Sequence, residues 1–176
     1  TARTREALVI DLLGLEDRDA RHRFPELYGH LLRTVKPERD RNNRATYRDN
    51  WWLFGEPRRE LRPALAGLPR YIATVETAKH RLFQFLDAAI IPDNMLVCVA
   101  TDDAFHLGIL SSRAHAVWTR LAGGSLEDRP RYTKSACFAP FPFPEADAAT
   151  RHAIAAHAQE LDDTRRPSSP TIPTSP

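Results

Sequence analysis

The chain has 176 residues, of which 42% are hydrophobic and 27% are charged, and its formal net charge is +2. This length and composition predict a soluble globular protein that is large enough to bury a hydrophobic core. No apolar run approaches the roughly 20 residues that a membrane-spanning helix needs, so we expect no membrane partner.

The two cysteines argue against a metal centre or a disulfide framework. Cys98 and Cys137 belong neither to a CxxC motif nor to a Cys/His ligand pattern. Cys98 lies in the apolar run MLVCVA, where a small buried hydrophobic side chain is the expected role. We therefore expect no metal site and a reducing, cytoplasmic setting.

The N-terminal part of the chain is predicted to be helical. The apolar run 7–15 is too short for its periodicity to distinguish a strand from a helix. Apolar residues recur at helical spacing over 24–35, with Pro25 in the first turn and Pro37 as the expected end. A second helix is predicted over 47–54, and it restarts after a proline over 58–65.

About five strands are predicted in the remainder of the chain. They are rich in β-branched and aromatic residues or follow turn signals, and they cover 70–75, 80–87, 95–100, 105–112 and 131–138. A helix is expected over 113–121, with Ser111 or Ser112 as its N-cap and Gly123 and Gly124 at its end.

An alanine-rich helix over 146–163 precedes a tail of Pro, Ser and Thr residues. Such a tail is predicted to be flexible, because its composition supports neither helix nor sheet. The order of elements predicts an α+β fold with a helical N-terminal portion, a mixed sheet of about five strands and a C-terminal helix. We expect one domain over 1–166 and a tail over 167–176.

Positive charge is concentrated in one segment. From Arg33 to Arg81 there are twelve basic side chains and six acidic ones, interleaved with Tyr47, Trp51 and Trp52. Arginine together with aromatic residues is typical of surfaces that bind a phosphate backbone and stacked bases. A solvated arginine-rich helix explains the same composition. We expect one of the two tryptophans in the core and the other at the surface.

The motifs of several enzyme classes are absent from the sequence. It contains no GxxxxGK[ST], GxGxxG, GxSxG or HExxH motif. His152 and His157 are five residues apart, which does not place them on one helical face, and Asp102 and Asp103 lie in a predicted turn. We expect no catalytic residues in this chain.

Four sequence pieces occur in a fixed order: KPERDRNNRATYRDNWWLFGEPR over 36–58, GLPRYIATVETAKHRLF over 67–83, DDAFHLGILSSRAHAVWTRLAGGSLEDR over 102–129, and RYTKSACFAPFPFP over 131–144. This arrangement resembles the C-terminal target-recognition region of bacterial adenine-specific DNA methyltransferases, above all type IIG restriction–modification enzymes and phage-defence methyltransferases. The element LGILSSRAHAVW followed by FPFP is the most specific part of the resemblance.

The resemblance implies a domain that reads a short sequence of double-stranded DNA and positions an adenine for N6 methylation. In that family a separate catalytic domain binds S-adenosylmethionine and grips a flipped adenine with an Asn-Pro-Pro-Tyr-type motif, which this chain lacks. We therefore expect the catalytic domain of the same parent chain as a partner, no cofactor in this chain, and no methyl transfer by it alone.

Candidate DNA-binding residues follow from charge and position. Backbone contacts are expected from the arginines after Pro37 and from the corner before the helix 113–121, where free N–H groups favour phosphate. Base contacts are expected from strand ends and loops. The set comprises Arg41, Arg44, Arg48, Arg58, Lys79, His80, Arg81, Ser111, Ser112, Arg113, His115, Arg131 and Lys134. Ser112 as a plain N-cap is an equal alternative. The FPFP run is expected to be structural.

A second functional interpretation belongs to another class. In it the chain is a protein-interaction or assembly domain, and the basic segment 33–81 docks an acidic partner with its aromatic residues as anchors.

Overall fold

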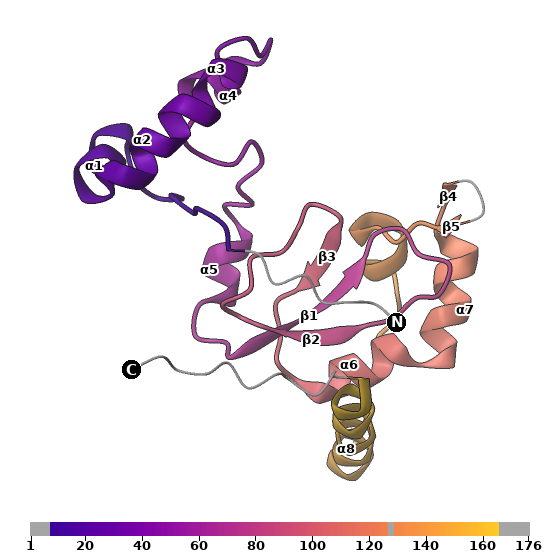
Figure 1. The fold of residues 1–176 in the computed structure, drawn as a ribbon. Coiled ribbons are helices and arrows are strands. Elements are labelled where there is room, and N and C mark those ends of the chain that lie inside the picture. Colours follow the sequence, from indigo (N-terminus) through magenta and orange to yellow (C-terminus); the bar gives the residue numbers. More distant parts are fainter. Residues whose placement is uncertain (1–7, 127–128, 166–176) are drawn as a thin grey trace. The chain divides into compact units, whose positions relative to one another are not determined.

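The computed structural model describes residues 8–126 and 129–165. The chain divides into two compact units, Thr1–Arg59 and Glu60–Pro176. Helices and strands follow one another as in an α+β fold, which confirms the predicted class (Figure 1). The predicted domain boundaries, 1–166 and 167–176, stay predictions, and the predicted tail lies outside the described residues.

The N-terminal unit is a small group of short helices: α1 Asp17–Arg23, α2 Pro25–Thr34, α3 Lys36–Arg39 and α4 Ala45–Asp49. Its core consists of Leu12, Ala20, Tyr28, Leu31 and Trp51. The Tyr28 hydroxyl donates a hydrogen bond to Asp17 Oδ1 at 2.8 Å, which joins α1 to α2.

The predicted helix over 24–35 is confirmed as α2, with Pro25 at its first position. Pro37 does not stop helical structure, because α3 begins at Lys36 and a proline in a first turn lacks only an N–H that would have no partner there. The predicted helix over 47–54 is shorter than expected, since α4 ends at Asp49 and Asn50 has a non-helical backbone.

The C-terminal unit contains the remaining elements. They are α5 Leu61–Leu65, β1 Arg70–Val75, β2 Gln84–Asp87, β3 Leu96–Val99, α6 Ala104–Ser111, α7 Arg113–Ala122, β4 Ser125–Leu126, β5 Arg129–Pro130, a π-helical turn Lys134–Phe138 and α8 Ala148–Arg165.

The prediction of a mixed sheet of about five strands is wrong. Within the described residues the main sheet has three strands in the order β2-β1-β3, all antiparallel. Tyr71 pairs with Leu86 on one side of β1, and Ala73 pairs with Cys98 on the other. The strands β4 and β5 form a separate antiparallel pair.

The predicted strand over 105–112 is instead the helix α6. Asp103 caps it, because its Oδ1 accepts a hydrogen bond from the Phe105 N–H at 2.8 Å. α6 is apolar on most of its surface, so its sequence carries no clear period. Neighbouring α8 covers one side, and Gly108 allows the approach, since a Cβ there would lie 2.6 Å from the Ile154 methyl Cγ2.

The predicted strand over 131–138 is also wrong. Only Arg131 pairs, through an isolated bridge to Thr77, and the chain then turns into the π-helical segment. The Thr133 hydroxyl accepts a hydrogen bond from the Ala136 N–H at 3.3 Å and starts that turn. Fully buried Tyr132 and Cys137 anchor its two ends in the core.

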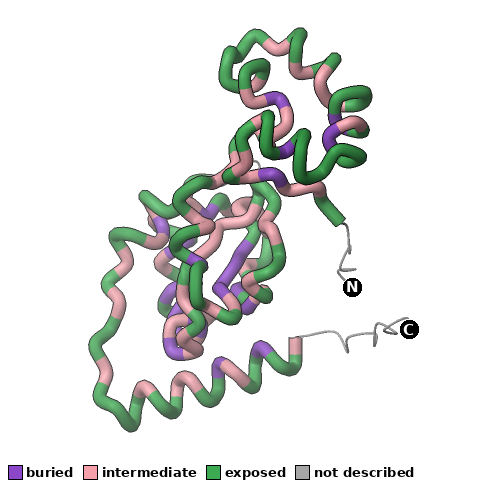
Figure 2. The backbone as a smooth tube through the Cα atoms, turned by 90° about the vertical axis from the view of Figure 1, so that its left-hand side faces the viewer, coloured by how far each residue is buried: buried purple, intermediate pink, exposed green. Residues whose placement is uncertain are grey.

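The core of the C-terminal unit lies between the sheet, α6, α7 and α8. It comprises Ile72, Phe83, Phe85, Leu107, Leu110, Tyr132, Cys137 and Ala158. Along α8 buried positions recur only at intervals, at Ala158 and Asp162, so one side of the helix packs inward (Figure 2). The Asp162 carboxylate accepts a hydrogen bond from the Phe85 N–H at 2.9 Å and ties α8 to β2.

The FPFP run is structural, as expected. The Phe141 ring meets His115 edge-on at a centroid distance of 4.4 Å and contacts Trp118 at 5.8 Å. The Phe143 ring contacts Phe138 at 5.3 Å. The run therefore holds α7 and the π-helical turn together.

Candidate nucleic-acid interface

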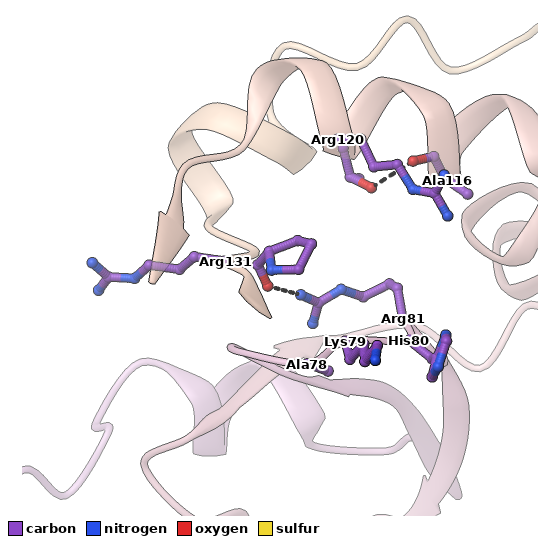
Figure 3. Close-up of a pocket in the computed structure, with 9 residues that line it drawn as sticks. Ala78, Lys79, His80, Arg81, Ala116, Arg120 and Arg131 are labelled. Carbon is purple, nitrogen blue, oxygen red and sulfur yellow. Dashed lines mark hydrogen bonds between the residues drawn. The ribbon is translucent and has the colours of Figure 1, made fainter. Parts of the chain in front are cut away.

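An open pocket with a cavity volume of about 180 Å³ lies in the C-terminal unit (Figure 3). It is bounded by the segment that follows β1, by one face of α7 and by β5. Basic side chains dominate its lining: Lys79, His80, Arg81, Arg120 and Arg131. Ala78, Ala116, Thr119 and Pro130 complete it. We call it the basic pocket.

Arg81 lines the basic pocket, and hydrogen bonds to the backbone hold its side chain in place. Its guanidinium donates hydrogen bonds to the carbonyl oxygens of Val75, Glu76 (3.2 Å) and Pro130 (2.8 Å). Figure 3 draws a hydrogen bond of the Arg81 guanidinium as a dashed line. The guanidinium also lies 5.2 Å from the centre of the Tyr132 ring. Burial lowers the pKa of this guanidinium, whose donors are committed to backbone acceptors.

Two fully buried side chains, His115 and Tyr132, lie next to Arg81. His115 Nε2 and the Tyr132 hydroxyl are 3.1 Å apart and share a hydrogen bond. Burial, and next the charge of Arg81, lower the pKa of His115 to about 4, so the ring is neutral at pH 7. Burial raises the pKa of Tyr132, which stays a neutral phenol. Arg81 therefore contacts Tyr132, and Tyr132 is hydrogen-bonded to His115 of α7, with both partners of that hydrogen bond uncharged.

The other basic groups of the pocket are more open. Lys79, His80 and Arg120 are exposed, and none of them forms an ion pair with another described residue. Arg131 is 55% exposed and pairs with Glu76 through an Nε–Oε1 contact of 2.5 Å. Figure 3 shows its side chain extending away from Arg81. An anionic ligand in the pocket could therefore contact the exposed basic side chains, while Arg81 stays bound to its backbone acceptors.

The structure brings four of the sequence-predicted site residues together in this pocket: Lys79, His80, Arg81 and Arg131. The sequence analysis missed Arg120. The helical spacing of α7 could have indicated Arg120, because it lies one turn after Ala116, which also lines the pocket.

The predicted DNA-binding residues at the corner between α6 and α7 differ in how far they are exposed. Ser112 is the N-cap of α7, since its hydroxyl accepts a hydrogen bond from the His115 N–H at 3.2 Å. The Ser111 hydroxyl is buried, and Arg113 is exposed at the start of α7. His115 is fully enclosed, so the structure does not offer it to DNA. Lys134 is exposed at the first position of the π-helical turn.

The three arginines after Pro37 that were expected to contact the DNA backbone do not lie on one helix. Arg41 follows α3, Arg44 is the N-cap of α4, and Arg48 lies within α4. Arg48 is tied down, because its Nη1 donates to the Asn42 carbonyl at 2.6 Å. Arg58 has a left-handed backbone with a φ of 47° and is half-buried.

The two tryptophans separate as expected. Trp51 is buried in the core of the N-terminal unit and meets the Tyr28 ring edge-on. Trp52 is partly exposed, and its Nε1 donates a hydrogen bond to the Leu15 carbonyl at 3.0 Å. Both rings are engaged within their own unit.

Two further features of the described residues bear on the class of protein. No helix among them has the length and apolar character to cross a membrane. Over the same residues, no three His, Cys, Asp or Glu side chains are grouped so as to hold a metal ion.

Fold and pocket together define an α+β domain with a cationic, anion-accepting surface. Comparison with known proteins places it more closely. Residues 12–145 match the family described as "MmeI, target recognition domain", and the chain belongs to that family. The prediction of a target-recognition domain of the kind found in DNA methyltransferases is thereby confirmed, and the acidic-partner interpretation is not favoured.

Two relatives illustrate the similarity. The chain is 29% identical over 85 residues to DNA methyltransferase A of Bacillus subtilis (strain 168), which is 48% of this chain and 10% of that protein. The solved structure of the type IIL restriction–modification enzyme MmeI in complex with DNA shares the fold, with a TM-score of 0.69 and 21% identity over 90% of this chain. The chain corresponds to 21% of that structure's length.

Proposed function

We propose that this chain recognises a short sequence in double-stranded DNA and positions a target adenine for N6 methylation by a separate catalytic domain of the same parent protein. The observation that carries the proposal is the basic pocket, found in a chain that belongs to the MmeI target-recognition family. Duplex DNA presents a regular array of phosphates, and exposed basic side chains beside the fixed Arg81 suit such a ligand.

Within the pocket we assign different roles to the basic residues. Lys79, His80 and Arg120 contact DNA, because they are exposed and have no ion-pair partner among the described residues. Arg131 lies at the rim, where exchange of its Glu76 partner for a base edge or a phosphate costs little. Arg81 positions these groups, because its own donors are used on carbonyl oxygens.

The methyl donor is assigned to the separate catalytic domain. S-adenosylmethionine carries a sulfonium cation, and a pocket lined by Lys79, Arg81 and Arg120 would repel it. The parent is accordingly a site-specific adenine methyltransferase of restriction–modification or phage defence, acting on cytoplasmic DNA. Arg113 and Lys134, which are exposed outside the pocket, stay candidate contacts to the duplex, whereas the buried hydroxyl of Ser111 does not favour such a contact.

The test is a salt titration of duplex DNA binding by fluorescence anisotropy with the full chain. Neutralisation of about four to six phosphates gives a slope of log K against log salt near −4 to −5. Lys79→Gln and Arg120→Gln each flatten the slope by about one unit. Arg18→Gln is the matched control, since Arg18 is an exposed arginine on α1. A slope near zero for the unchanged chain would overturn the proposal.

The DNA target motif of the parent enzyme and of its variants is measured by methylome sequencing. Arg131→Ala should cost roughly 1–3 kcal/mol on the cognate site and relax the target motif at one base position. Arg120→Gln should weaken methylation of all sites alike, because a phosphate contact carries no sequence information. An unchanged motif in the Arg131 variant would remove Arg131 from the reading role.

A further inference from the structure

A second group of cations lies on the N-terminal unit, around the ring of Tyr47. The Arg39 guanidinium carbon is 4.7 Å from the centre of this ring, and that of Arg44 is 5.6 Å from it. Neither guanidinium forms a hydrogen bond or an ion pair with the described residues. We call Arg39, Arg44 and Tyr47 the tyrosine platform.

The platform is built by the turn between α3 and α4 and is braced from two sides. The Asn42 side-chain oxygen accepts a hydrogen bond from the Arg44 N–H at 2.9 Å, and the Asn42 carbonyl accepts one from Arg48. Gly55 packs against the edge of the Tyr47 ring, where any Cβ would overlap ring atoms. The ring is therefore fixed before any ligand arrives.

The surroundings of the platform are positive. Residues 36–48 carry five basic and two acidic side chains. One of the acids, Asp40, is already neutralised by Lys36, whose Nζ lies 2.7 Å from its Oδ1. Arg41, exposed in the same turn, adds a further cation.

When a guanidinium packs over an aromatic ring, the face of the guanidinium contacts the ring. Its N–H donors lie in the guanidinium plane and stay available to another partner. That planar fork matches two oxygens of a phosphate, and the stacking holds it in place at a reduced entropy cost. The helices here have only four and five residues, which is too short to fill a major groove as a reading helix. Backbone recognition fits this geometry better than base recognition.

We propose that the tyrosine platform is a phosphodiester-binding site, at which Arg39 and Arg44 hold the DNA backbone independently of sequence. The inference rests on the proposed DNA-binding function and adds a second contact area, on the other unit, to the basic pocket. Arg39 replaces Arg48 among the contacting arginines, since Arg48 is bound to the Asn42 carbonyl.

The experiment is a salt series of anisotropy titrations with the full chain and a duplex of arbitrary sequence. Arg39→Gln and Arg44→Gln should each make the slope of log K against log salt less steep by about 0.9. Tyr47→Leu should weaken binding about two- to fivefold at fixed salt, because the guanidinium groups lose their stacking surface. Tyr47→Phe keeps the ring and should bind like the unchanged chain.

Arg18→Gln on α1 is the matched control and should leave the slope unchanged; α1 and the turn between α3 and α4 lie at opposite ends of α2 (Figure 1). Slopes of the Arg39 and Arg44 variants equal to that of the control overturn the inference, while Lys79→Gln and Arg120→Gln still report on the proposed function. Full binding by Tyr47→Leu also overturns it. Tryptophan fluorescence, which comes from Trp51, Trp52 and Trp118 together, verifies that each variant stays folded.

Discussion

The arginines of the two units are used in opposite ways. Arg81 in the C-terminal unit is half-buried and donates to backbone carbonyls of Val75, Glu76 and Pro130. Arg39 and Arg44 in the N-terminal unit lie over the Tyr47 ring, at 4.7 and 5.6 Å from its centre, and their guanidinium groups donate no hydrogen bond to a described carbonyl oxygen. We therefore expect a basic residue to contact a ligand only where its hydrogen-bond donors are not already committed, whatever its place in a charge run.

The largest expected effect concerns the aromatic ring beneath each arginine. Tyr132→Ala should lower the free energy of unfolding by about 3–5 kcal/mol, because the ring is fully buried and carries both the His115 hydrogen bond and the Arg81 stack. Tyr47→Ala should cost much less, since that ring is partly exposed. Urea unfolding of both variants measures the difference, and equal losses would break the comparison.

The arginines themselves give the next test. Arg81→Gln should lower the free energy of unfolding by about 2 kcal/mol, because partly buried carbonyl oxygens lose a charged donor. Arg44→Gln, which removes an exposed group, should stay within about 0.5 kcal/mol of the unchanged chain. If Arg81→Gln is as stable as Arg44→Gln, Arg81 has no positioning role.

Acid should destabilise the C-terminal unit through His115. The folded-state pKa of about 4 lies below the ordinary value of 6.5, so between these pH values the unfolded chain binds a proton that the folded chain does not. Stability therefore falls as the pH drops from 6.5 to 4, by an amount on the order of 2 kcal/mol. Urea unfolding at several pH values measures it, and hydrogen exchange locates it.

The control for this prediction is His115→Gln, which keeps a polar side chain and cannot titrate. It should be less stable at pH 7 but show a flatter dependence on pH between 6.5 and 4. The N-terminal unit offers a contrast, because His22 and His30 are both exposed. Loss of protection that begins in the N-terminal unit on acidification would contradict the assignment to His115.

The smallest effect separates a helix cap from a DNA contact. Ser112→Ala should cost about 1 kcal/mol of stability, because the hydroxyl accepts the His115 N–H and caps α7. Ser112→Asp, which retains an acceptor, should restore most of it. The salt slope of DNA binding should be the same in Ser112→Ala as in the unchanged chain; a flatter slope would return Ser112 to the set of phosphate contacts.

Elements with local sequence signals could be predicted correctly. The β-branched run that forms β1, the N-cap Ser112 of α7, Pro25 at the start of α2 and the alanine-rich α8 could all be read from neighbouring residues. The order of quoted motifs also indicated the family, because several pieces in a fixed order are specific even when each is weak.

The remaining features depend on contacts between elements, which the sequence pattern does not show. α6 is apolar on most sides, so its helical state depends on packing against α8 through Gly108, and the run 131–138 turns where Tyr132 and Cys137 are buried. The positive charge of Arg81 was visible in the sequence, but its carbonyl partners lie in two places, the nearby pair Val75 and Glu76 and the distant Pro130. Local sequence sets backbone preference and charge, whereas the availability of a charged group depends on contacts between residues that are distant in the chain.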